Sequence, residues 1–129
     1  MYHYTKHYTL TEAQETLVEI LPVIEEIAHL KEALDDKGYD VFRHQYFGGS
    51  GPNGQKVFPT EMEMLVTHVR DLNERGIEIK DLNRGLIDFP HLRTNGEEVY
   101  LCYLLGEPEI IAWHSIEGGF SGRNTLDEL

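Results

Sequence analysis

The stretch that decides the fold is residues 77–114, IEIKDLNRGLIDFPHLRTNGEEVYLCYLLGEPEIIAWH. At its start, residues 77–80 alternate apolar and charged side chains, which is the two-residue period of a half-buried strand. Further along, Asn95-Gly96 between two runs rich in apolar residues is a strong signal for a hairpin turn. We therefore predict an antiparallel β-meander of three or four strands, built from residues 77–80, 85–90, 98–104 and 109–114.

Pro90 stands at the end of the second of these segments. Proline has no backbone N–H to donate to a β-ladder, so it is confined to edge strands or ends a strand. We therefore expect residues 85–90 to form an edge strand or to stop at Pro90.

The residues before this stretch are predicted to form helices. Thr9 and Glu12 have the spacing of a capping box, in which each side chain accepts a hydrogen bond from the other residue's backbone at the start of a helix. The apolar residues that follow recur at helical spacing and include a narrow, coiled-coil-like seam with a seven-residue period. This seam consists of Ile20, Ile27, Leu34 and Val41.

Two residues interrupt the pattern of this first helix. Pro22 lacks an N–H and clashes with the preceding turn, so we expect a kink or a restart there. Gly38 either stays inside the helix, at a cost of about 1 kcal/mol relative to alanine, or ends it. Because Val41 continues the seam, we favour a helix that continues to about residue 45.

A second helix is predicted from about residue 60 to residue 75, after a glycine-rich loop at residues 47–58. Two helices with one apolar stripe each pack most easily as an antiparallel hairpin. A chain of 129 residues fits a single domain. We therefore expect an α+β fold in which a long helical hairpin, about residues 9–75, carries the β-meander and a C-terminal arm, about residues 76–123.

The charge and the cysteine content narrow the function classes. The chain has 23 acidic and 11 scattered basic residues, whereas binding to nucleic acid requires clustered basic ones, so we expect no nucleic-acid partner. We expect no membrane partner, because no run approaches the roughly 18 apolar residues of a spanning helix. With no apolar leader and one cysteine, the chain is predicted to be cytoplasmic. Cys102 lies in an apolar run and is expected to be a buried, inert thiol.

The apolar seam of the first helix also bears on assembly. The small sheet can cover only one face of the helical hairpin, and an exposed apolar strip of that length usually marks an interface. We therefore expect a homodimer whose helices pack across a two-fold axis, the commonest closed symmetry.

Asp88 is an unexplained acidic residue within an apolar run, Leu86-Ile87-Asp88-Phe89. If it is buried, its carboxylate needs a cation or several hydrogen-bond donors. The candidate cations are Lys80, Arg84 and Arg123, and pairing with Arg123 would attach the C-terminal arm to the sheet.

Polar residues at strand ends and on loops are where binding sites usually lie. His114 ends a predicted strand and could bind a divalent metal or move a proton, with Asp88 or Glu107 orienting its second nitrogen. Arg123, on the glycine-rich arm, offers a planar fork for a small anionic ligand. The candidate ligand-binding residues are Asp88, Glu107, Trp113, His114 and Arg123.

His3 and His7 could join His114 in a metal site, because imidazole suits zinc or nickel. No Cys-x-x-Cys or His-Glu-x-x-His motif supports such a site. The alternative is a mobile N-terminus that contains two histidines.

The same C-terminal residues carry a family likeness, in KDL with GLIDFP, in LCY with GEP, and in WH with GFSGR (residues 80–82, 85–90, 101–103, 106–108, 113–114 and 119–123). Together with the opening YTLTEA, residues 8–13, they make the chain resemble the bacterial domain-of-unknown-function family 2203 over almost its whole length. Tyr103 departs from the pattern, in which we expect tryptophan after the cysteine. The resemblance implies no established activity and therefore assigns no catalytic residue. It supports residues 76–123 as the distinctive unit.

Three functions follow as expectations. The first is a binding module for a small ligand or metal, with its site on the sheet and the C-terminal arm. The second is a homo-oligomeric scaffold without a ligand site. The third is a hydrolase that uses the same polar residues, which requires a carboxylate, a histidine and an ordered water in one cleft.

Overall fold

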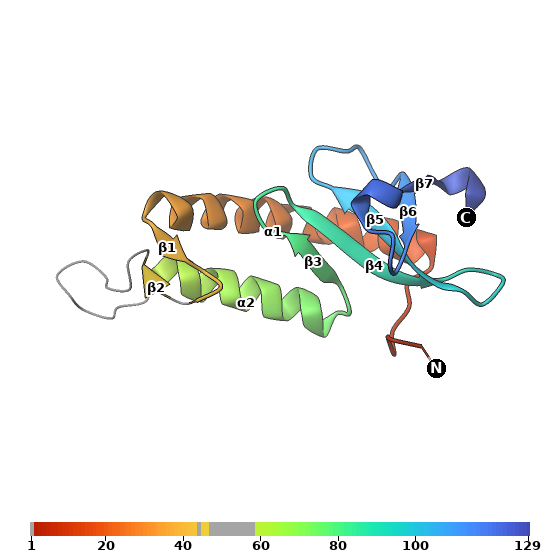
Figure 1. The fold of residues 1–129 in the computed structure, drawn as a ribbon, viewed down its shortest axis with the longest axis horizontal. Coiled ribbons are helices and arrows are strands. Elements are labelled where there is room, and N and C mark those ends of the chain that lie inside the picture. Colours follow the sequence, from red (N-terminus) through yellow and green to blue (C-terminus); the bar gives the residue numbers. More distant parts are fainter. Residues whose placement is uncertain (1, 44, 47–58) are drawn as a thin grey trace.

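The structure, a computed structural model, describes residues 2–43, 45–46 and 59–129 and has an α+β fold (Figure 1). Helices α1 (Leu10–Asp36) and α2 (Thr60–Glu74) lie side by side and run in opposite directions. A small antiparallel ribbon of β1 (Tyr39–Asp40) and β2 (Gln45–Tyr46) lies at one end of the helix pair. The loop expected at residues 47–58 lies outside the described residues.

The main sheet has five antiparallel strands in the order β3-β4-β5-β6-β7, so each strand pairs with its neighbour in sequence. This is the expected meander, but with five strands instead of three or four. The additional strand is β7, which pairs with β6 and follows the last segment that we predicted as a strand. The strands are β3 (Glu78–Asp81), β4 (Leu86–Leu92), β5 (Glu98–Leu104), β6 (Ala112–Ser115) and β7 (Asn124–Thr125).

The start of α1 is as predicted, and its end is not. The Glu12 N–H donates to Thr9 Oγ1 at 3.0 Å and the Thr9 N–H donates to Glu12 Oε1 at 2.9 Å, which completes the capping box. The helix passes through Pro22 without a restart and ends at Asp36, rather than near residue 45. It ends because Gly38 adopts a left-handed conformation with φ 72°, which turns the chain into β1.

Pro90 lies in an interior strand, and not at an edge as expected. β4 continues to Leu92, and Pro90 pairs with Tyr100 of β5. On its other side β3 begins at Glu78, which pairs with Asp88, so β3 does not extend alongside Pro90. On this side Pro90 therefore faces no β3 residue that would need a backbone N–H from it. Its carbonyl oxygen accepts the Tyr8 N–H at 2.7 Å instead.

The alternation of side chains divides the sheet into two different faces. One face is apolar and belongs to the main core together with the buried stripes of α1 and α2. The alternate residues of these strands point to the opposite face. They are Asp88, Pro90, Tyr100, Cys102 and His114. The residues on the core face are Ile87, Phe89, Val99, Leu101, Tyr103 and Trp113.

The seam that led us to expect a homodimer is covered within one chain. Ile20, Ile27 and Leu34 are at most 2% exposed and Val41 is 7% exposed, because α2 and the sheet pack over them. The exposed large apolar side chains of the described residues stand on separate elements, among them Val18 of α1 and Met64 of α2. Within the described part of the chain, neither helix has the length and apolar character needed to cross a membrane.

Replacing Gly85 by alanine is expected to destabilise the fold, because Gly85 joins β3 to β4 at φ +63° and its added Cβ would lie 2.6 Å from Leu105 Cβ. Gly106→Ala is the matched control, since Gly106 also has a positive φ, +107°, but no atom within 4 Å of the added Cβ. Both variants carry backbone strain of roughly 1–2 kcal/mol, and Gly85→Ala adds roughly 1–3 kcal/mol of overpacking. Urea denaturation measures the difference, and equal losses in the two variants would contradict the close packing at Gly85.

Candidate metal and ligand site

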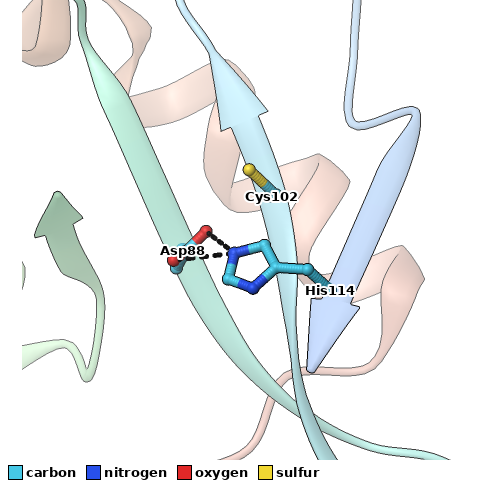
Figure 2. Close-up of side chains that lie close together, drawn as sticks. All are labelled: Asp88, Cys102 and His114. Carbon is cyan, nitrogen blue, oxygen red and sulfur yellow. Dashed lines mark hydrogen bonds and ion pairs between the residues drawn. The ribbon is translucent and has the colours of Figure 1, made fainter. Parts of the chain in front are cut away.

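Three polar side chains converge on the sheet face opposite the core. Asp88 of β4 and Cys102 of β5 are direct cross-strand partners. His114 of β6 pairs with Tyr100, two residues before Cys102 on the same face. Figure 2 shows Asp88 and His114 pointing toward each other across β5, with Cys102 projecting from the strand between them. All three are at most 2% exposed, so the group is enclosed within the protein.

The hydrogen bonds of His114 determine what its ring can do. Its Nδ1 lies 2.7 Å from the Ser115 carbonyl oxygen, which can only accept, so Nδ1 carries a proton. Its Nε2 lies 3.1 Å from both carboxylate oxygens of Asp88. Because a carboxylate also accepts, Nε2 must either carry a second proton or use its lone pair to bind a metal between the two residues.

Without a metal, the surroundings favour the protonated ring. Burial is the largest influence and lowers the pKa of His114, and the charge of Lys80 also lowers it. The hydrogen bond and charge of Asp88, with the bond to the Ser115 carbonyl, outweigh these effects and raise the pKa of His114 overall. Burial and the negative charge of Asp88 raise the pKa of the Cys102 thiol to about 12, so the thiol is neutral in the metal-free protein.

The ligating atoms of Asp88, Cys102 and His114 all lie within 4.8 Å of one another. Among the described residues, this buried group is the one whose side chains could hold a metal ion. The set combines a carboxylate oxygen, a thiol sulfur and an imidazole nitrogen, which suits zinc and related transition metals better than magnesium or calcium.

A cavity of about 200 Å³ lies beside the Asp88–His114 pair. Residues that follow β6 form one wall, and side chains of β3, β4, β5 and β6 form the rest. Its charged residues Lys80 and Glu117 are both exposed, so they stand at the rim. The lining residues are Lys80, Leu86, Asp88, Tyr100, His114, Ile116, Glu117, Gly119 and Phe120.

Tyr100 connects this cavity to the N-terminal segment. The Tyr4 hydroxyl donates to Glu78 Oε1 at 3.4 Å, and the Tyr100 hydroxyl is hydrogen-bonded to Tyr4. The Lys80 ammonium lies 4.7 Å from the centre of the Tyr100 ring, which in turn lies 5.3 Å from the His114 ring. Tyr100, which lies beside the Asp88–His114 pair, is therefore contacted by both the N-terminal segment and β3, which are far apart in sequence.

The structure brings Asp88 and His114 together but gives Arg123 a different partner from the one we expected. Asp88 pairs with His114 and not with Lys80, Arg84 or Arg123, the three cations that we considered. The Arg123 guanidinium donates to Glu107 Oε2 at 2.8 Å, and Glu107 Oε1 accepts the Leu104 N–H at 2.7 Å. Arg123 and Glu107 therefore attach the arm to the turn after β5, and the guanidinium of Arg123 is already paired with a carboxylate.

The remaining predicted site residues lie elsewhere. Trp113 occupies the core face of β6, 7% exposed, and its indole N–H donates to the Thr125 carbonyl at 3.0 Å. His3 and His7 gather at Glu98, where the His3 N–H and the His7 ring contact the carboxylate at 2.8 and 2.7 Å. They do not belong to the group around His114, because Glu98 is the first residue of β5 and lies four residues before Cys102 along the strand.

Cys102 is the site residue that sequence reasoning missed, since we expected an inert thiol. The signal was present in the hairpin, because Asp88 and Cys102 each lie seven residues from Asn95 (95 − 7 and 95 + 7). Two residues equally distant from the middle of a hairpin loop face each other across the strands. The rule gives this pairing only if the hairpin loop has three residues, those between Arg93 and Glu97. A two-residue loop of Asn95 and Gly96 would give a different register.

Comparisons with known proteins assign no activity to this site. The family model described as "Uncharacterized conserved protein (DUF2203)" matches residues 6–126. The chain is also similar to peptide chain release factor 2 of Saccharopolyspora erythraea, with 42% identity over 52 residues. That alignment covers 40% of this chain and 13% of the release factor, so the chain spans a small part of its relative. No solved structure matches the chain.

The Asp88–His114 pair should make the stability of the metal-free protein depend on pH. Because the pKa of His114 is raised in the fold, the pair stabilises fully below the ordinary histidine pKa of about 6.5. This stabilisation is lost as pH rises through the raised pKa. The free energy lost in His114→Gln should therefore shrink as the pH rises above about 6.5. Urea denaturation in the presence of a chelator measures it, and a loss that is constant across this range would contradict the protonated pair.

Proposed function

The chain belongs to the DUF2203 family of uncharacterized conserved proteins, and we propose that its function is to bind a divalent transition metal, zinc above all, through Asp88, Cys102 and His114. The family description names no activity, so the proposal rests on the geometry of these three side chains. It is the metal-binding form of the binding module expected from the sequence.

The observation that carries the proposal is the hydrogen bond from His114 Nδ1 to the Ser115 carbonyl oxygen. In metal sites the non-ligating nitrogen of a histidine commonly donates to a backbone carbonyl or a carboxylate, which fixes the tautomer and aims the other nitrogen at the metal. Here Nε2 is aimed between the Asp88 oxygens, near Cys102. The space between Nε2 and the Asp88 oxygens, which the Nε2 proton occupies in the metal-free protein, is therefore suited to a metal cation.

The spacing of the three side chains also supports the proposal. Zinc bonds of about 2.0–2.3 Å in a tetrahedron place neighbouring ligand atoms about 3.3–3.6 Å apart. His114 Nε2 and the Asp88 oxygens are 3.1 Å apart, and the sulfur of Cys102 lies within 4.8 Å of both ligands. Binding therefore requires the Cys102 sulfur to move inward, a slight separation of His114 from Asp88, and no change of strand register.

Metal binding would also explain a thiol at this position. The proton on Cys102 is held firmly in the metal-free protein, because burial and Asp88 raise the pKa of the thiol to about 12. A coordinated cation reverses this preference, since it binds the thiolate and releases the proton. Two anionic ligands, Asp88 and the Cys102 thiolate, would then neutralise the charge of a divalent ion inside the protein.

Three protein ligands leave one tetrahedral position free, which is the pattern of zinc sites that bind a water or a substrate. The cavity of about 200 Å³ lined by Asp88 and His114 offers room for that fourth ligand. This supports a ligand-binding role and keeps hydrolysis by a metal-bound water as a second candidate. A scaffold role has less support, because the seam that suggested it is buried within the chain.

Purified protein treated with a chelator should bind one cobalt ion per chain, with the near-ultraviolet charge-transfer band of a thiolate–cobalt bond. Zinc should displace the cobalt, and zinc at 100 times its Kd should raise the free energy of unfolding by about 2.7 kcal/mol. Cys102→Ala should lose the charge-transfer band, and His114→Gln should lose most of the affinity, because each removes one ligand.

His7→Gln is the matched control for this experiment. His7 also forms a pair with a carboxylate, at 2.7 Å from Glu98 Oε2, but it has no thiol beside it. It should therefore retain the cobalt band and the zinc stabilisation of the wild type. Failure of the wild type to bind cobalt or zinc would refute the proposal, and so would an equal loss of binding in His7→Gln and His114→Gln.

A further inference from the structure

We infer that the cavity beside Asp88 and His114 binds a small monocarboxylate, whose charged end lies between the metal and Lys80 and whose apolar end lies against Leu86, Ile116 and Phe120. This inference rests on the proposed metal site and goes beyond it, because it specifies the class of molecule that takes the fourth coordination position.

Unpaired cations at the rim of the cavity favour an anion. Within the described parts of the chain, neither Lys80 nor Arg84 makes an ion pair with an acidic side chain, although acidic residues outnumber basic ones 23 to 11. The ammonium of Lys80 is held 4.7 Å from the centre of the Tyr100 ring, and the Arg84 guanidinium lies 5.2 Å from the centre of the Phe120 ring. Both rings line the cavity, and Lys80 is itself a lining residue, so its positive charge stands at the opening.

The charge of the metal site makes these cations necessary for binding an anion. A divalent ion held by Asp88 and a Cys102 thiolate has a net charge of zero, so the ion alone attracts an anion weakly. Lys80 supplies the missing positive charge, and it lines the same cavity as Asp88 and His114. Glu117 lines the same cavity and opposes an anion, but it is exposed to solvent, which screens its charge.

The rest of the cavity favours a ligand with an apolar part. Leu86, Ile116 and Phe120 provide apolar walls. Two guanidinium groups contact the Phe120 ring, with Arg123 at 4.8 Å and Arg84 at 5.2 Å from its centre. A volume of about 200 Å³ accommodates a short aliphatic or single-ring carboxylate but not a nucleotide or a peptide. Inorganic phosphate would leave the apolar walls uncovered.

The test is a titration of the cobalt-loaded protein with butyrate, followed by the visible bands of cobalt, which report a new ligand at the metal. Butyrate should change these bands in a saturable manner, whereas 1-butanol, which has the same chain without the charge, should not. Lys80→Met should weaken butyrate binding roughly fivefold, and Glu117→Gln should strengthen it about twofold, as expected for partly exposed charges.

Lys6→Met is the matched control for the lysine. The Lys6 ammonium also lies over a tyrosine ring, 4.5 Å from the centre of Tyr8, but it lines a different cavity. Butyrate binding that is equal in Lys80→Met and Lys6→Met would overturn the inference, as would a cobalt spectrum that butyrate leaves unchanged. In both cases the thiolate–cobalt band would still be present, whereas absence of that band would refute the metal site itself.

Discussion

The pairing of β4 with β5 is the constraint on which the rest of this structure depends. The register places Asp88 opposite Cys102 and Phe89 opposite Leu101, so one face of the pair is polar and the other is apolar. A shift of one residue would move Asp88 into the core between the sheet and α1 and expose Phe89 on the opposite face. The three-residue loop around Asn95-Gly96 sets this register, and the apolar face that packs on α1 stabilises it.

A buried polar face is costly unless each of its groups has a partner, and the C-terminal part of the chain provides these partners. Ser115 supplies the carbonyl that orients His114, and His114 supplies the partner of Asp88. The Arg123–Glu107 pair then attaches the arm to the turn after β5, which keeps Phe120 over the cavity. The site is therefore complete only when β6 and the arm have docked, which couples its geometry to folding of the last third of the domain.

In the proposed function, the same geometry serves two states of the site, which differ in the cation that lies between Asp88 and His114. A proton on Nε2 gives a buried imidazolium–carboxylate pair beside a neutral thiol. A metal ion in that position would recruit the thiol as a thiolate and expel two protons. Buried groups with strongly perturbed pKa values beside a cavity are typical of functional sites, although structural pairs also produce them. The presence of Cys102 within reach of the pair is what favours the metal here.

The sequence by itself determined the elements whose signals are local. The capping box of Thr9 and Glu12, the span of α2 and the hairpin around Asn95-Gly96 depend on neighbouring residues, and all three are present in the structure. Tertiary structure decided what depends on distant partners. The helix ended near Gly38 although Val41 continued its apolar period, because Val41 reaches the core from the following loop. Asp88 pairs with His114 and not with an arginine, and Cys102 lies beside them. Cross-strand register brings these three residues together, although no local sequence pattern connects them.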